Sequence, residues 1–123
     1  MIAKMFRFHG HSSLNYVYRK GASVRGPMCA IKYIHNPRRT RYRAAIVVSK
    51  KVHKNAVVRN RIRRRCYEII RNLLDQSTEP YDIVVTIFSD TIASLPQSEL
   101  ELMITAQLKQ AGILQNKTNN KVA

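Results

Sequence analysis

Apolar residues recur every three or four positions between residues 56 and 74 of this chain. At 100° per residue they fall on one stripe, the spacing of an amphipathic helix. The stripe consists of Val58, Ile62, Cys66, Ile69 and Leu73. Asn55 precedes the stretch and is a suitable N-cap. The pattern therefore predicts a helix over about residues 56–74. Its opposite face carries Asn60, Arg64, Tyr67 and Arg71.

Runs of β-branched and alternating residues predict four strands. The expected ranges are about 22–25, 28–34, 42–49 and 81–88. Residues 44–48 are apolar without interruption, which is typical of a strand buried on both faces, and they predict a central strand. Lys32 lies among apolar residues of the second strand. Its face of the sheet is either a cationic groove floor or an ordinary exposed surface.

Two further helices are expected near the ends of the chain. Ser12 or Ser13 can cap a first helix that stops at Lys20–Gly21, and a last helix begins near residues 94–98 and ends at Gly112. The element order is then α-β-β-β-α-β-α, an α+β sandwich of helices against a sheet of about four strands. We expect residues 12–114 to form one domain, with a basic lead-in at 1–11 and a frayed tail at 115–123.

Positive charge is concentrated in the first half of the chain. Residues 1–67 carry 18 Lys and Arg and no acid, whereas residues 68–123 carry 4 Lys and Arg against 7 acids. This distribution implies a large polyanionic partner. An anionic membrane is disfavoured because the apolar stripe is narrow, and no run approaches the length of a spanning helix. Cys29 and Cys66 occupy apolar-periodic positions, so reduced core thiols and a cytoplasmic protein are expected.

Five arginines lie between positions 59 and 65 with no acid before Glu68. A solvated helix face normally alternates acids and bases, and the arginine guanidinium matches phosphate in a two-pronged geometry. The helix therefore favours a nucleic-acid partner over a merely soluble face. The basic half has no carboxylates to hold a metal and the chain shows no nucleophile–base arrangement, so we expect no catalytic residue and no metal site in the protein.

The segment AVVRNRIRR at residues 56–64, preceded by VSKKV at 48–52, closely resembles the signature of the bacterial ribonuclease P protein subunit. The resemblance extends over about residues 13–114. It implies the fold called ribosomal protein S5 domain 2-like, with a left-handed βαβ crossover where the general rule predicts a right-handed one. It also implies that the RNA subunit is the catalyst and requires Mg²⁺, and that the protein itself binds no cofactor. The implied partners are this catalytic RNA and precursor tRNA, with no membrane and no DNA.

The resemblance and the charge pattern together suggest two RNA-binding surfaces. The surface expected to dock on the RNA subunit consists of Arg59, Asn60, Arg61, Arg63, Arg64 and Arg65. A cleft between the first helix, the sheet and the arginine helix would hold the single-stranded 5′ leader of precursor tRNA. Its expected lining is Leu14, Tyr18, Lys32, Tyr33, Lys50 and Lys51. The Tyr18 ring either stacks on a leader base or packs in the core.

Two other classes share parts of this pattern. A ribosomal or RNA-chaperone protein would have similar charge without stimulating the cleavage of precursor tRNA. A DNA-binding module would need base-reading side chains near the start of its recognition helix, where this chain has Ala56, Val57 and Val58.

Overall fold

The computed structural model describes residues 11–38, 41–74 and 80–114. The elements in these ranges are α1 (His11–Lys20), β1 (Ala22–Arg25), β2 (Cys29–His35), β3 (Arg43–Val47), α2 (Ala56–Leu74), β4 (Tyr81–Ile87), the short 3₁₀ helix η2 (Asp90–Ala93) and α3 (Gln97–Ala111). The predicted order of helices and strands is confirmed, and η2 occupies the predicted connector after the last strand. Nearly all of the predicted lead-in, the loop at 75–79 and the tail lie outside the described residues.

The four strands form one mixed sheet in the order β1-β2-β4-β3. β2 pairs antiparallel with both β1 and β4, whereas β3 pairs parallel with β4. The prediction that residues 42–49 form a central strand is wrong, because β3 is an edge strand of this sheet. Its continuous apolar run has another cause, which is burial on both faces. Ala44 and Ile46 belong to the main core, while Ala45 belongs to a small cluster on the other face.

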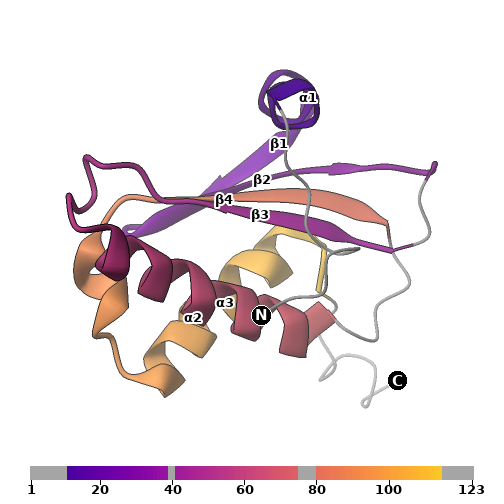
Figure 1. Ribbon diagram of the computed structural model, residues 1–123. Coiled ribbons are helices and arrows are strands. Elements are labelled where there is room, and N and C mark those ends of the chain that lie inside the picture. Colours follow the sequence, from indigo (N-terminus) through magenta and orange to yellow (C-terminus); the bar gives the residue numbers. More distant parts are fainter. Residues whose placement is uncertain (1–10, 39–40, 75–79, 115–123) are drawn as a thin grey trace, which may run out of the picture.

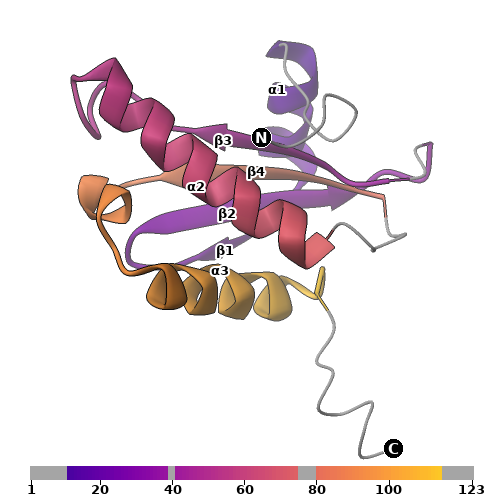
Figure 2. The same cartoon turned by 60° about the horizontal axis from the view of Figure 1, so that its bottom comes forward.

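The molecule has three layers, with α1 on one face of the sheet and α2 and α3 on the other (Figures 1 and 2). The main core lies between the sheet and α2, η2 and α3. On the α1 face, Val17 packs against Ala45 and Val84. The chain passes from β3 through α2 to the parallel strand β4 with the left-handed turn that can be followed in Figure 2.

Helix α2 has the bounds that its sequence period predicts. The Asn55 side chain caps it, accepting a hydrogen bond from the backbone nitrogen of Val57 at 2.9 Å. The placement of Tyr67 on the exposed face is wrong, since this residue is buried. Its hydroxyl accepts a hydrogen bond from the backbone nitrogen of Ile46 at 3.2 Å. A tyrosine can join the core when its polar tip finds such a partner.

The last helix is also tied to the sheet by a buried polar side chain. Gln107 donates to the carbonyl oxygen of Cys29 at 3.1 Å and accepts from the Cys29 thiol at 3.0 Å. Gly112 ends the helix with φ of 82°, a left-handed conformation that favours glycine. Cys29 and Cys66 are both free and buried, as predicted. Burial raises the pKa of the Cys29 thiol to about 11 and that of the Cys66 thiol to about 12.

Candidate nucleic-acid interface

The exposed side of α2 presents two arginines without internal partners. Arg61 and Arg64 are exposed, and among the described residues neither makes a hydrogen bond or an ion pair. Between them and the start of the helix lies a shallow hollow of about 350 Å³, lined by Val57, Asn60, Arg63 and Arg64. Arg61 and Arg64 can therefore contact an anionic partner without giving up a bond to the described residues. We call this surface the α2 ridge; it consists of Arg59, Asn60, Arg61, Arg63 and Arg64.

Two other arginines of the run are partly engaged with the chain that enters α2. Arg59 donates to the carbonyl oxygens of His53 and Lys54 at 3.0 and 3.1 Å. Arg63 donates to the side-chain oxygen of Asn60 at 2.6 Å and to the carbonyl oxygen of Val48 at 3.3 Å. These bonds orient the guanidinium groups and hold the turn before α2 against the helix.

Arg65 has a structural role that the sequence analysis did not assign. Its guanidinium donates to the carbonyl oxygens of Ile92 and Leu95, the first at 2.6 Å, and to the Gln97 side chain at 3.4 Å. Arg65 therefore fastens α2 to η2 and to the start of α3. Of the six residues predicted for this surface, it is the one whose hydrogen-bond partners lie in η2, in the segment that leads into α3 and in α3 itself.

Helix α1 places two tyrosines on either side of its buried contact with the sheet. Val17 is fully buried, whereas Tyr16 and Tyr18 are 49% and 37% exposed. The Lys32 ammonium donates to the carbonyl oxygen of Tyr18 at 3.0 Å and lies 5.7 Å from the centre of its ring. The structure thus brings Tyr18 and Lys32 together, as predicted, and favours the exposed role of Tyr18 over packing in the core. Leu14 lies in α1, but its side chain is outside what the structure describes.

The predicted shape of the leader cleft is wrong in two respects. Tyr33 follows Lys32 in β2 and therefore points to the other face of the sheet. There it packs against the main core, with its ring centre 6.2 Å from that of Tyr81. In addition, α1 and α2 lie on opposite faces of the sheet (Figure 1), so no groove is bounded by both helices. Lys50 and Lys51 are exposed in the turn between β3 and α2.

A cation–aromatic pair on the α1 face was not found from the sequence. The guanidinium carbon of Arg25 lies 4.5 Å from the centre of the Phe88 ring, and Phe88 is 38% exposed. Arg25 pairs with Ala30, two residues before Lys32 in β2, and so lies on the same face as Lys32. We call Tyr18, Lys32, Arg25 and Phe88 together the α1-face shelf. The Arg25–Phe88 contact depends on the strand order, which explains why no local pattern indicates it.

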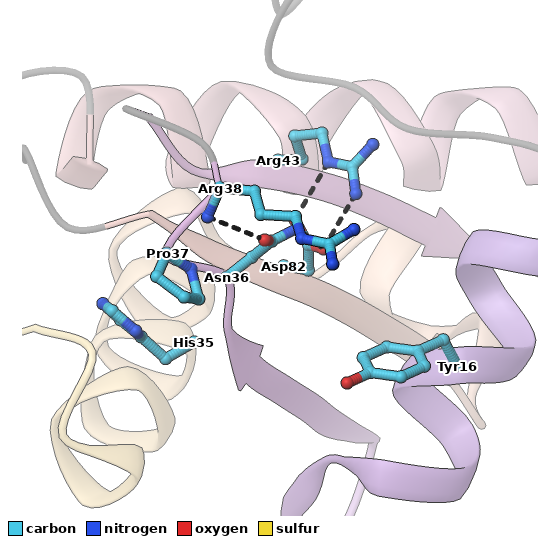
Figure 3. A pocket seen from close by; sticks show the side chains of 7 residues that line it. All are labelled: Tyr16, His35, Asn36, Pro37, Arg38, Arg43 and Asp82. Carbon is cyan, nitrogen blue, oxygen red and sulfur yellow. Dashed lines mark hydrogen bonds and ion pairs between the residues drawn. The ribbon is translucent and has the colours of Figure 1, made fainter.

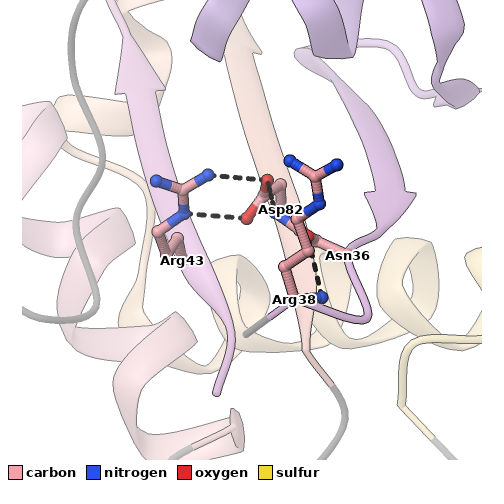
Figure 4. Close-up of polar contacts among 4 residues, drawn as sticks. All are labelled: Asn36, Arg38, Arg43 and Asp82. Atoms are coloured by element: carbon pink, nitrogen blue, oxygen red, sulfur yellow. Dashed lines mark hydrogen bonds and ion pairs between the residues drawn. The ribbon is translucent and has the colours of Figure 1, made fainter. Parts of the chain in front are cut away.

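On the Tyr16 side of α1, the sheet carries an open pocket of about 480 Å³ (Figure 3). Its floor is a partly buried ion pair in which Arg43 donates to both oxygens of Asp82, at 2.9 and 2.8 Å. Asn36 also donates to Asp82 at 3.0 Å and accepts from the backbone nitrogen of Arg38 at 3.2 Å (Figure 4). These bonds join β3, β4 and the turn after β2.

Comparison with known proteins identifies the family of the chain. The family model described as Ribonuclease P matches residues 2–112 of the chain. The chain belongs to the ribonuclease P protein family. A ribonuclease P protein component from Pseudanabaena is 40% identical over 96 residues, which cover 78% of this chain and 81% of that protein. One from Chloroflexus aurantiacus is 35% identical over 120 residues, covering 98% of this chain and 87% of that protein.

Solved ribonuclease P proteins share the fold. The Staphylococcus aureus protein superposes with a TM-score of 0.79 at 24% identity, covering 89% of this chain and 98% of that one. The Thermotoga maritima protein gives a TM-score of 0.72 at 20% identity, covering 85% and 96%. Membership in the ribonuclease P family places the chain in tRNA processing, as a component of an endoribonuclease complex. Within the described ranges, no helix is long and apolar enough to cross a membrane.

Proposed function

We propose that this chain is the protein subunit of a bacterial ribonuclease P, which binds the catalytic RNA and the 5′ leader of precursor tRNA. It promotes removal of the leader, so that the mature 5′ end of tRNA is formed. One observation supports the proposal. The α2 ridge and the cations of the α1-face shelf lie on opposite faces of one sheet, because α1 and α2 cover opposite faces (Figure 1). The α2 ridge takes the RNA subunit, while the α1-face shelf takes the leader.

The α2 ridge suits the backbone of a structured RNA. Arg61 and Arg64 are free to form two-pronged hydrogen bonds with phosphate oxygens, and such bonds position a partner without reading its sequence. Arg59 and Arg63 lie beside them, oriented by their bonds to the segment that precedes α2, and Asn60 accepts a hydrogen bond from Arg63. Folded RNA is recognised mainly by its shape, which a rigid cationic helix can match.

The α1-face shelf suits an unpaired strand. Tyr18 and Phe88 present exposed rings, and each has a cation beside it, Lys32 and Arg25 respectively. Aromatic rings stack on unpaired bases with little regard to sequence, while neighbouring cations hold the phosphates. Lys32 and Ala30 are two residues apart on β2, about 7 Å along the strand, and Ala30 pairs with Arg25. The two rings therefore offer successive stacking positions on one face, with Lys50 and Lys51 in the turn beyond β3.

Catalysis is assigned to the RNA subunit, with its Mg²⁺ held by RNA. The seven acids of the chain all lie at or after Glu68, outside the basic half. Glu68 forms an ion pair with Arg71 at 2.8 Å, and Asp82 is held by Arg43. In the described part of the chain, no group of three His, Cys, Asp or Glu is arranged to hold a metal ion. We propose that the protein supplies binding energy alone. We also propose that it acts in the cytoplasm, where its two buried free thiols stay reduced.

Reconstitution of the holoenzyme tests this function. The full chain is added to a bacterial ribonuclease P RNA at low Mg²⁺, and 5′ maturation of a precursor tRNA is followed. We expect the chain to accelerate cleavage and an Arg61→Ala/Arg64→Ala double variant to require a higher protein concentration for the same rate. A ribosomal or RNA-chaperone protein would bind the RNA without this acceleration. Binding without faster cleavage at any protein concentration would therefore favour that alternative.

A further inference from the structure

The pocket beside Tyr16 contains more positive charge than its fold requires. Arg43 is neutralised by Asp82, which also accepts from Asn36. Arg38 brings a second guanidinium to the side of Asp82 opposite Arg43 (Figure 4). No hydrogen bond or ion pair of this guanidinium occurs within the described residues. Among the described residues that line the pocket, Asp82 is the one acid, so this lining carries one uncompensated positive charge.

The pocket also has an unused aromatic wall. Tyr16 points from α1 across its mouth, with half of its surface exposed (Figure 3). Pro37 lies on the opposite side, whereas the His35 ring points to the other face of the sheet, where it packs against Tyr81 (Figure 3). The volume of about 480 Å³ is within the range of small-molecule sites. A ligand that fits must combine a flat ring, which can stack on Tyr16, with an anionic group that Arg38 can bind.

We infer that this pocket binds a nucleotide, with the base against the Tyr16 ring and the phosphate at the Arg38 guanidinium. Two sources share this chemistry, a free mononucleotide and an unpaired nucleotide within an RNA chain. The site is separate from the α1-face shelf, because Tyr16 and Tyr18 lie on either side of the buried Val17. It is also remote from the α2 ridge, which lies on the other face of the sheet (Figure 1). Its occupation therefore does not depend on the function proposed above.

The test uses the purified full chain, with AMP, inorganic phosphate and a single-stranded trinucleotide as probes. Amide chemical shifts of His35, Asn36, Arg38 and Arg43 report occupation of the pocket itself. We expect AMP to shift these signals and to bind more tightly than phosphate. Tyr16→Ala should weaken AMP binding about 5- to 150-fold, which corresponds to the loss of one stacking partner. Arg38→Ala should weaken it about tenfold or more.

Matched variants separate this site from general attraction of anions. Tyr16→Phe keeps the ring and should keep the affinity, while Arg19→Ala removes an exposed cation of the same helix and should change nothing at the pocket. A melting curve of each variant verifies folding. If the trinucleotide alone shifts the pocket signals, the source is an RNA chain, and if AMP also does, free nucleotides qualify. Absence of shifts with all probes, or equal losses in Tyr16→Ala and Tyr16→Phe, would overturn the assignment.

Discussion

The Arg65 guanidinium donates a 2.6 Å hydrogen bond to the carbonyl oxygen of Ile92, so that one arginine of the basic run holds η2 against α2. Arg64, its neighbour in sequence, is exposed and has no partner in the described chain. Two adjacent arginines of one motif therefore serve different ends. Arg65 supports the fold, and Arg64 is available to RNA.

This difference predicts opposite phenotypes. Arg65→Ala should lower the free energy of unfolding by about 1.5–3 kcal/mol, because charged hydrogen bonds to backbone carbonyls are lost. Arg64→Ala should change it by less than about 0.5 kcal/mol while weakening RNA binding. Urea denaturation and RNA titration of both variants measure the two effects. Equal stabilities of the two variants would show that the Arg65 contacts contribute nothing.

The α2 ridge predicts a steep dependence of RNA affinity on salt. Each phosphate contact releases counterions, so the logarithm of affinity should fall linearly with the logarithm of salt concentration, at about 0.7–0.9 per contact. Arg61→Ala should reduce this slope by about 1. Titrations of the RNA subunit at several salt concentrations, from low to moderate, measure this slope. A slope that is identical in the wild type and the variant would place Arg61 outside the interface.

The α1-face shelf predicts that Phe88 discriminates precursor from mature tRNA. Phe88→Ala should cost about 1–3 kcal/mol of affinity for precursor tRNA in the assembled holoenzyme, because one stacking position is lost. Mature tRNA, which has no leader, should bind as before. Tyr18→Ala should behave in the same way. A melting curve serves as the control, and equal losses for both tRNAs would contradict a leader contact.

The buried thiols predict a loss of stability in alkali. Burial raises the pKa of Cys29 and Cys66 to about 11 and 12, from an ordinary value of 9.0. Above pH 9 the unfolded chain therefore releases thiol protons that the folded chain retains. Stability is complete below pH 9 and falls as pH rises toward 11, by up to about 1.4 kcal/mol per pH unit for each thiol. Urea melts at pH 8, 9 and 10 should show a shallower decline in Cys66→Ala than in the wild type.

Position 21, where the end of α1 lies against β2, is expected to accept only glycine. A β-carbon at this position would lie 2.6 Å from the carbonyl oxygen of Val17 and 2.7 Å from that of Tyr33. Both contacts are with backbone, so neither atom can move aside easily. Gly21→Ala should therefore destabilise the protein by more than about 1 kcal/mol. Gly112→Ala, with open space around it, tests the separate effect of a positive φ. A Gly21→Ala variant as stable as the wild type would exclude this close approach.

The sequence was informative wherever local rules decide the structure. The period of apolar residues and the Asn55 cap predicted the bounds of α2, and Gly112 predicted the end of α3. Tyr67 was misplaced because a ring with a polar tip fits both the surface and a core that supplies a hydrogen-bond partner. Strand order is a tertiary property, and for this reason the edge position of β3 could not be predicted from its composition.

The candidate sites likewise contain residues that the sequence could assign and residues that only the fold brings together. Arg64 could be assigned to the exposed face from helical spacing alone. The joint placement of Lys32 and Tyr33 in one cleft conflicted with strand alternation, which the sequence already contained. Arg25 and Phe88 meet only because β1, β2 and β4 are neighbours in the sheet. No spacing rule connects residues that far apart in the chain.

The position of α1 and α2 on opposite faces has a mechanical consequence (Figure 2). A helix packs about 10 Å from the layer beneath it, so the axes of α1 and α2 are separated by roughly 20 Å. The strands between them are joined by continuous backbone pairing, which makes this thickness difficult to compress. Two RNA molecules bound on the two sides would be held at a fixed distance, which the thickness of the sheet determines. The distance between the leader and the catalytic RNA would then be set by the thickness of this one small protein.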